Sequence, residues 1–166
     1  MMASKPGSCA GSAGLVLHVA TPDDAPRLAL WNRQLIEDEG HDNAMSVDQL
    51  EARMRTWLAT EYRALFFEEP ATSRRVAYTL FRETPEWIHL RQFFVARDRR
   101  RRGVGARAVA LLRETVFAPD KPVIVEAMTW NHAALSFWRA VGFADRYVGL
   151  ESRPAAPAPL PRRLSS

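Results

Sequence analysis

The sequence contains very little cysteine, since Cys9 is the only one among 166 residues. One cysteine can form neither an internal disulfide nor a cysteine-rich zinc site, and the four histidines show no HExxH or other close pairing of metal ligands. We therefore expect no metal centre. The sequence also lacks the run of about 18 apolar residues that a membrane span needs, and its start lacks the apolar stretch of a signal peptide. These absences predict a cytoplasmic protein that binds no membrane.

The length and composition are sufficient for an ordinary hydrophobic core. The 166 residues are 47% hydrophobic and 25% charged, as in one typical globular domain. A chain of this size buries roughly 68–70% of the surface that its unfolded form exposes. Stability therefore requires no disulfide and no structural metal.

The net charge of +4 is concentrated at the two ends of the chain. Residues 15–151 carry equal numbers of basic and acidic side chains, because the surplus bases are Lys5, Arg153, Arg162 and Arg163. Within this neutral part, residues 91–113 contain eight arginines and a single acid. This distribution predicts a small, focused anion site. It does not fit the broad basic face that a nucleic-acid duplex requires, so no nucleic-acid partner is expected.

Both ends of the chain are predicted to be disordered. Residues 1–14 are rich in serine, glycine and alanine, and residues 152–166 contain four prolines. Such compositions bury little surface and cannot form a regular hydrogen-bond ladder. The folded domain is therefore predicted to span residues 15–151.

Hydrophobic spacing and capping signals predict ten secondary-structure elements in the order β-α-α-β-β-β-α-β-α-β. The first two helices are predicted to begin after Thr21 and after Ser46, each of which can cap a helix. The other helices are predicted over 104–117 and 131–141, and the strands over 15–19, 64–68, 75–83, 86–96, 122–127 and 144–151. This order indicates an α+β fold of three layers, with a mixed, mostly antiparallel sheet flanked by helices.

An arginine-rich turn between a strand and a helix carries the strongest functional signal. The segment Arg100-Arg101-Arg102-Gly103-Val104-Gly105 follows a predicted strand and opens a predicted helix. The first amide N–H groups of a helix lack intrahelical acceptors and lie at its positive end, where phosphates bind. The segment is neither a P-loop nor a dinucleotide fingerprint. A solvated arginine cluster is the alternative, and the segment alone does not decide between the two.

Two motifs, one over residues 100–105 and one over residues 131–143, together resemble those of the GNAT superfamily of acetyltransferases. Arg100-x-x-Gly103-x-Gly105 fits the Q/R-x-x-G-x-G/A element of that superfamily. About 30 residues later, the segment from Asn131 to Phe143 is similar to the element N-x-x-A-x-x-F-Y-x-x-x-G-F. One predicted helix and one predicted strand separate the two motifs, as in the superfamily. The resemblance extends over nearly all of residues 15–150.

The resemblance implies that the chain binds acetyl-CoA or another short acyl-CoA. The amides of residues 101–106 would hold the pyrophosphate, and strand residues 94 and 95 and Asn131 would contact the pantetheine arm. Asn131 could instead simply cap the following helix. The residues that the resemblance assigns to the cofactor are Phe94, Val95, Arg100, Arg101, Arg102, Gly103, Val104, Gly105, Ala106, Asn131, Ala134, Phe137 and Trp138.

The implied reaction is direct transfer of the acetyl group to an amine in a ternary complex. The Val95 N–H is the candidate oxyanion donor. The superfamily's usual tyrosine acid is replaced by Trp138, whose indole cannot deliver a proton and for which core packing is the favoured interpretation. His89 and Glu126 are the candidate bases, although each could be structural, with deprotonation left to the substrate or solvent.

The resemblance also indicates where the acceptor amine binds. The loop after the first helix is acidic, and we expect Glu37, Asp38 and His41 in it to attract a cationic small-molecule or peptide amine, unless the loop is merely solvated. Only one strand is predicted after Phe143, where relatives commonly have two, so a homodimer could supply the missing edge. The alternative function is a non-catalytic acyl-CoA-binding regulatory module.

Overall fold

The computed structural model describes residues 14–152, and the segments predicted to be disordered lie almost entirely outside this range. Within it, five strands form one sheet in the order β1-β2-β3-β4-β5. The first four strands are antiparallel neighbours, and β5 runs parallel to β4. This confirms the mixed, mostly antiparallel sheet. The strands are β1 (Val16–Val19), β2 (Tyr62–Glu69), β3 (Arg74–Glu83), β4 (Ile88–Val95) and β5 (Val123–Val125).

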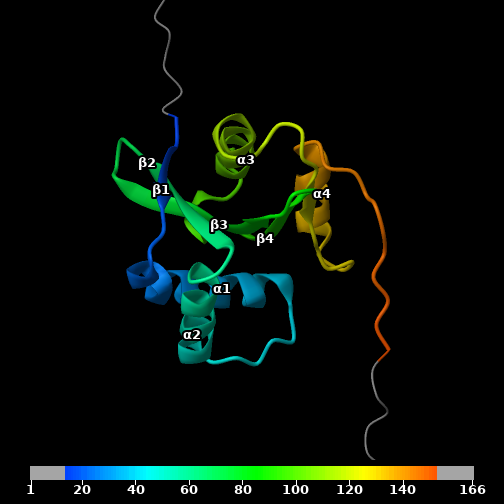
Figure 1. Cartoon of the computed structure of the whole chain (residues 1–166), viewed down its shortest axis with the longest axis horizontal. Helices are drawn as coiled ribbons and strands as arrows, with labels where there is room; N and C mark the ends of the chain where they lie inside the picture. Colours follow the sequence, from blue (N-terminus) through cyan, green and yellow to red (C-terminus); the bar gives the residue numbers. More distant parts are fainter. Residues whose placement is uncertain (1–13, 153–166) are drawn as a thin grey trace, which may run out of the picture.

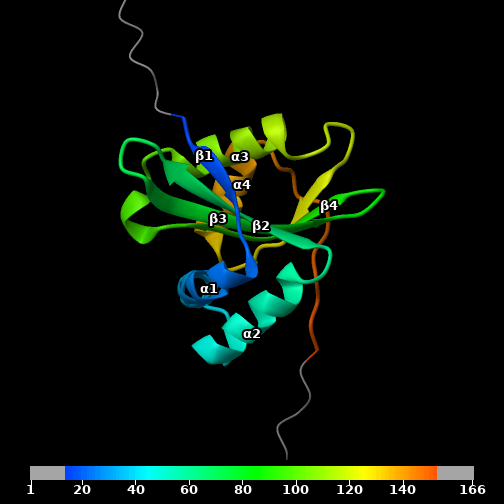
Figure 2. The same ribbon diagram turned by 60° about the vertical axis from the view of Figure 1, so that its left-hand side comes forward.

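Helices cover both faces of the sheet. Figure 1 shows α1 and α2 below the sheet and α3 above it, and Figure 2 shows the same layers after a turn of the molecule. None of the helices in residues 14–152 is long and apolar enough to cross a bilayer. The helices are α1 (Ala25–Glu39), α2 (Val47–Leu58), α3 (Val104–Thr115) and α4 (His132–Ala140), with short 3₁₀ turns η1 (Pro22–Asp24) and η2 (Arg97–Arg99).

Each face of the sheet has its own hydrophobic core. On the α3 side, Phe81 and Leu90 pack with Leu112 and Trp138. On the α1 side, aromatic residues dominate, and the Trp31 ring lies 5.4 Å from that of Phe94. A sheet that is covered on both faces must bury side chains of both alternating sets, which explains why its central strands read as nearly continuous apolar runs.

The start of α2 is fixed by the predicted capping box. The Ser46 side chain accepts a hydrogen bond from the Gln49 N–H, and the Gln49 side chain accepts one from the Ser46 N–H at 2.8 Å. We expect Ser46→Ala to lower the free energy of unfolding by about 1 kcal/mol, because an orphan helix donor loses its acceptor. Urea unfolding measures this change. Ser136→Ala, at an exposed position inside α4, is the control, and an equal loss in that variant would contradict the capping role.

Strand β4 contains a bulge at Arg91. Leu80 of β3 pairs with Gln92 and the next residue, Phe81, pairs with Leu90, so Arg91 has no partner in β3. The extra residue interrupts the alternation of side chains along the strand. Gln92 faces α1, whereas Leu90 packs into the core under α3. Arg91 and Gln92 therefore both face the side of the sheet that α1 and α2 cover.

The strand predicted over 144–151 is absent from the described structure, and that prediction is wrong. The chain leaves α4 at Gly142 and runs along one side of the molecule without joining the sheet (Figure 1). Arg139 of α4 binds Asp145 at 2.6 Å, which holds the start of this segment against the helix rather than against β5. β5 is therefore the outermost described strand on this side. The homodimer stays a prediction, which light scattering can check.

Candidate active site

Strands β4 and β5 separate at the centre of the molecule. They pair only where Ile88–Leu90 lie beside Val123–Val125, and β4 then continues alone to Val95. The Ala96 N–H donates to Val76 of β3, so alternation turns the Val95 N–H toward the opposite, unpaired edge. The same alternation turns the backbone groups of Phe93 toward the gap and those of Phe94 toward β3. Phe93 therefore replaces Phe94 as the partner of Val95 at this edge.

The arginine turn ends in a helix start with free backbone donors. Gly103 is the N-cap of α3 and has a φ of 73°, and no side chain caps the helix there. The first backbone bond of the helix runs from the Arg107 N–H to the Gly103 carbonyl. The N–H groups of residues 104–106 therefore lack intrahelical acceptors. Arg101, with a φ of 58°, and Arg102 are exposed beside them, which makes a site suited to phosphate.

The remaining arginines of the turn do not point to this helix start. Arg97 binds Asp38 at 2.7 Å and Glu37 at 3.2 Å, and Arg100 binds both Asp38 and the Val95 carbonyl. Burial raises the pKa of Asp38, but hydrogen bonds from the two arginines outweigh it and hold that pKa below its usual value. Ion pairs thus tie the turn to the end of α1. The structure uses Glu37, Asp38 and Arg100 in these contacts, which argues against their predicted roles as substrate and phosphate ligands.

The later motif packs against the helix start. A Cβ atom on Gly105 would lie 2.9 Å from the Phe137 ring, so this glycine permits the close contact of α3 with α4. Ala134 of α4 also packs against the core on this side. Asn131 caps α4 by accepting a hydrogen bond from the Ala134 N–H at 3.1 Å. Trp138 is buried, with its ring 5.4 Å from that of Phe93, as its core-packing interpretation requires.

The two candidate bases lie together. His89 Nε2 is 3.7 Å from Glu126 Oε2, and His89 is 9% exposed. Burial lowers the pKa of His89, and the attraction of Glu126 opposes this only in part, while Arg91 and Arg82 lower the pKa further. His89 is therefore neutral near pH 7. The Glu126 side chain is 67% exposed, so it is the member of the pair that solvent reaches.

This lowered pKa gives a prediction for stability. As the pH falls below 6.5, the ordinary value for histidine, the unfolded chain binds a proton that the folded protein still rejects. The free energy of unfolding must therefore fall with decreasing pH, by at most the slope of one proton, until the folded state also protonates. Urea unfolding between pH 7.5 and 5 should show this loss, and His89→Leu should reduce it. An equal reduction in His132→Gln, at an exposed histidine, would contradict the assignment.

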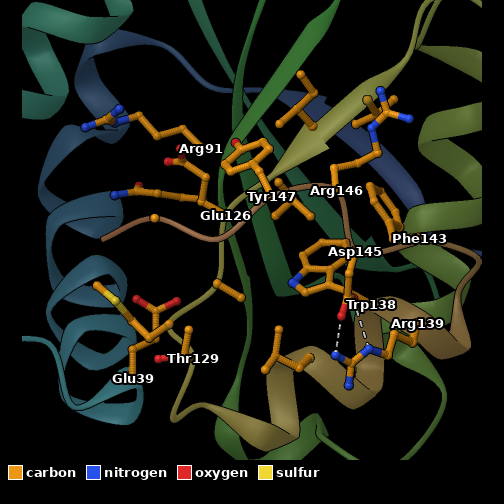
Figure 3. Close-up of a pocket in the computed structure, with 18 of the residues that line it drawn as sticks. Glu39, Arg91, Glu126, Thr129, Trp138, Arg139, Phe143, Asp145, Arg146 and Tyr147 are labelled. Atoms are coloured by element: carbon orange, nitrogen blue, oxygen red, sulfur yellow. Dashed lines mark hydrogen bonds and ion pairs between the residues drawn. The ribbon is translucent and has the colours of Figure 1, made fainter. Parts of the chain in front are cut away.

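A large open cavity of about 1,730 Å³ lies next to these groups. It extends from α1 and α2, past β5, to α4 and the segment after it. In Figure 3, Arg91 and Glu126 lie beside each other, Glu39 and Thr129 lie toward α1, and Trp138 lies on α4. Of the predicted site residues, Glu126, His41 and Trp138 line the cavity. His89 lies behind Glu126 rather than at the surface of the cavity.

Sequence reasoning missed several residues of this cavity. Asn32, Arg53 and Trp57 come from α1 and α2, and Arg91 comes from the bulge in β4. Their spacing in the sequence gave no signal, because the tertiary fold brings them together. Among residues 14–152, no group of three or more His, Cys, Asp or Glu side chains could hold a metal ion.

The sequence was also compared with protein families and with curated proteins. Residues 27–143 match the sequence model of the acetyltransferase (GNAT) family. None of the curated protein sequences matches the chain.

Solved structures of acetyltransferases have a similar fold. A possible acetyltransferase from Clostridium difficile 630 has a TM-score of 0.68 at 12% identity, covering 86% of this chain and 98% of its own. An aminoglycoside N-acetyltransferase in complex with CoA also has a TM-score of 0.68, at 11% identity, with coverages of 89% and 99%. An acetyltransferase from Thermus thermophilus has a TM-score of 0.64 at 22% identity, with coverages of 81% and 88%. At these identities the likeness shows the fold alone.

Proposed function

The chain belongs to the acetyltransferase (GNAT) family, and from this premise we propose that it is an acetyl-CoA-dependent N-acetyltransferase. It transfers the acetyl group directly from the CoA thioester to the amine of a small molecule or peptide, with both bound at once. The observation that carries this proposal is the uncapped start of α3, which lies next to the gap between β4 and β5.

The residues at the start of α3 fit a pyrophosphate. The N–H groups of Val104, Gly105 and Ala106 are free to donate, and the positive end of the helix dipole favours an anion there. Among the described residues, no atom lies within 4 Å of where the Cβ of Gly103 would be, so the approach to the backbone is open. Arg101 and Arg102 add permanent positive charge.

The gap between the strands fits the pantetheine arm. The outward backbone groups of Phe93 and Val95 can pair with an extended amide chain as a neighbouring strand would. The Val95 carbonyl is already bound by Arg100 at 2.9 Å, which leaves the Val95 N–H as the open donor at that residue. This N–H is our candidate for stabilising negative charge on the acyl oxygen. Asn131 lies at the start of α4, where its side chain caps the helix.

Glu126 is the proposed base. CoA supplies an acetyl group activated as a thioester, the amine nitrogen bonds to the acetyl carbon, and the carbon–sulfur bond breaks. The Glu126 carboxylate accepts the amine proton, directly or through one water. Neutral His89 behind it acts as a positioning residue. Departure of CoA as a thiolate needs no acid, because a thiol pKa of about 8.5 makes it a good leaving group.

A non-catalytic acyl-CoA-binding module is the second candidate. The observation in its favour is Trp138, which occupies the position of the tyrosine acid in the family motif and cannot deliver a proton.

Calorimetry with acetyl-CoA and a thiol-release assay with a panel of amines test both candidates. We expect acetyl-CoA to bind and thiol to appear only when a suitable amine is present. Binding without thiol release from any amine favours the module. Absence of binding at millimolar acetyl-CoA refutes both.

A further inference from the structure

Two arginines that form no ion pair within residues 14–152 lie together on the wall of the cavity. The guanidinium carbons of Arg53 and Arg91 lie 4.6 Å and 4.8 Å from the centre of the Trp57 ring. In the described part of the chain, neither arginine forms an ion pair with a carboxylate, and Arg53 Nε is buried without a hydrogen-bond acceptor. Burial lowers the pKa of Arg53, and the like charge of Arg91 lowers it further. The wall therefore carries two guanidinium groups that no ion pair within residues 14–152 neutralises.

A third donor beside the arginines also lacks a partner. Asn32 is 1% exposed, and its Nδ2 has no hydrogen-bond acceptor in residues 14–152. The Tyr78 hydroxyl donates to Gln92 Oε1 at 3.0 Å, and Gln92 Nε2 donates to Asn32 Oδ1 at 2.7 Å. This chain of bonds fixes the orientation of the Asn32 amide, so that the group left over is an N–H donor. An unpaired buried donor is costly unless a ligand supplies its acceptor.

One of these donors, Arg91, lies beside the proposed base. Leu90 and Val125 are paired neighbours on β4 and β5, Arg91 is the next residue of β4, and Glu126 directly follows the end of β5. Figure 3 shows the two side chains beside each other on the cavity wall, so one small molecule can reach both. Asn32, Arg53, Arg91 and Glu126 all line the same cavity.

We propose that the acceptor amine also carries a carboxylate, as an amino acid does, and that Arg53, Arg91 and Asn32 bind this carboxylate while its amine faces Glu126. This inference rests on the proposed function and adds the substrate class to it. Guanidinium groups match the planar carboxylate, and the Asn32 N–H supplies a further hydrogen bond. An aminoglycoside, which carries several amines and no carboxylate, would meet repulsion from the two arginines.

The test compares matched pairs of acceptors in the thiol-release assay. Each common amino acid is assayed beside its primary amide, which keeps the amine and removes the negative charge, and an aminoglycoside is included. We expect the preferred amino acid to exceed its amide in kcat/KM by about a hundredfold, since the site's donors are left unpaired by the amide. Arg53→Met and Arg91→Met should each lower this ratio of kcat/KM values at least about tenfold and leave acetyl-CoA affinity unchanged. Arg63→Met, on β2 outside the cavity, should leave the preference intact.

The outcomes separate this inference from the proposed function. Equal rates with acids and amides, or faster turnover of the aminoglycoside, overturn the inference and leave the transferase standing. If acetyl-CoA binds but no acceptor is turned over, calorimetry of CoA-loaded protein with N-acetyl amino acids and their amides decides. Tighter binding of the acids, lost in Arg91→Met, supports the carboxylate site, and equal binding overturns it. Absence of acetyl-CoA binding refutes the proposed function itself.

Discussion

Replacing Glu126 by glutamine is expected to lower kcat by about a hundredfold while leaving the affinity for acetyl-CoA unchanged. Proton removal by a positioned base contributes roughly 10²–10⁴ to the rate of such reactions, and glutamine keeps the shape of the side chain but cannot accept the proton. Thiol release under saturating substrates measures kcat, and calorimetry measures the affinity. Glu86→Gln, at an exposed acid in the turn before β4, makes the same charge change as a control.

The dependence of kcat on pH should be governed by His89, which lies 3.7 Å from Glu126. When the pH falls through the lowered pKa of His89, a positive charge appears 3.7 Å from Glu126, and the resulting ion pair competes with the incoming amine for the carboxylate. Activity should therefore decrease toward acidic pH, and His89→Gln should shift that decrease.

A Glu126→Gln variant that retains the wild-type rate would show that solvent or the substrate itself removes the proton.

Replacing Gly105 by alanine is expected to weaken acetyl-CoA binding by roughly ten- to hundredfold. The added Cβ would lie 2.9 Å from Phe137 Cε2 and 3.1 Å from Phe137 Cζ, so the helix start or the ring must move. Overpacking of this kind costs about 1–3 kcal/mol, and about 1.4 kcal/mol corresponds to a tenfold change in affinity. The displaced helix turn carries the amides proposed to hold the pyrophosphate. Calorimetry with CoA measures the loss.

A second substitution tests the cause of that loss. Phe137→Leu removes the ring that the new methyl group contacts, so the double variant should recover most of the affinity lost in Gly105→Ala. Gly14→Ala, where a Cβ meets nothing within 4 Å, is the control for the glycine change. If Gly105→Ala binds CoA like the wild-type protein, the helix start is not the pyrophosphate site.

The sequence was sufficient to predict most of the fold because its local signals agree with the tertiary structure. The capping box at Ser46 begins α2 as predicted, and the apolar runs of β2 to β4 form the expected antiparallel neighbours. The error at 144–151 has a physical cause. Apolar residues such as Tyr147 and Val148 favour a strand, but a strand exists only where a neighbour completes its hydrogen bonds.

The candidate site was only partly predictable. The motif spacing placed the helix start at Gly103, and the predicted strands supplied the candidate bases His89 and Glu126, which the structure places 3.7 Å apart. The sequence could not reveal that Asp38 is paired with Arg97, because such ion pairs depend on side chains some 60 positions apart. Nor could it reveal the charged wall at Arg91, because a bulge leaves no local pattern in the chain.

Because of the bulge at Arg91, even-numbered side chains face opposite sides of the sheet in the two halves of β4. Leu90 and Ile88 belong to the core under α3 although they share the parity of Phe94, which belongs to the core under α1. Deleting this one residue would make the register with β3 continuous and would leave Leu90, His89 and Gln92 on their present faces, because Arg91 is the only residue of the strand without a partner in β3. The bulge therefore adds a guanidinium group to the cavity wall without removing a side chain from either core.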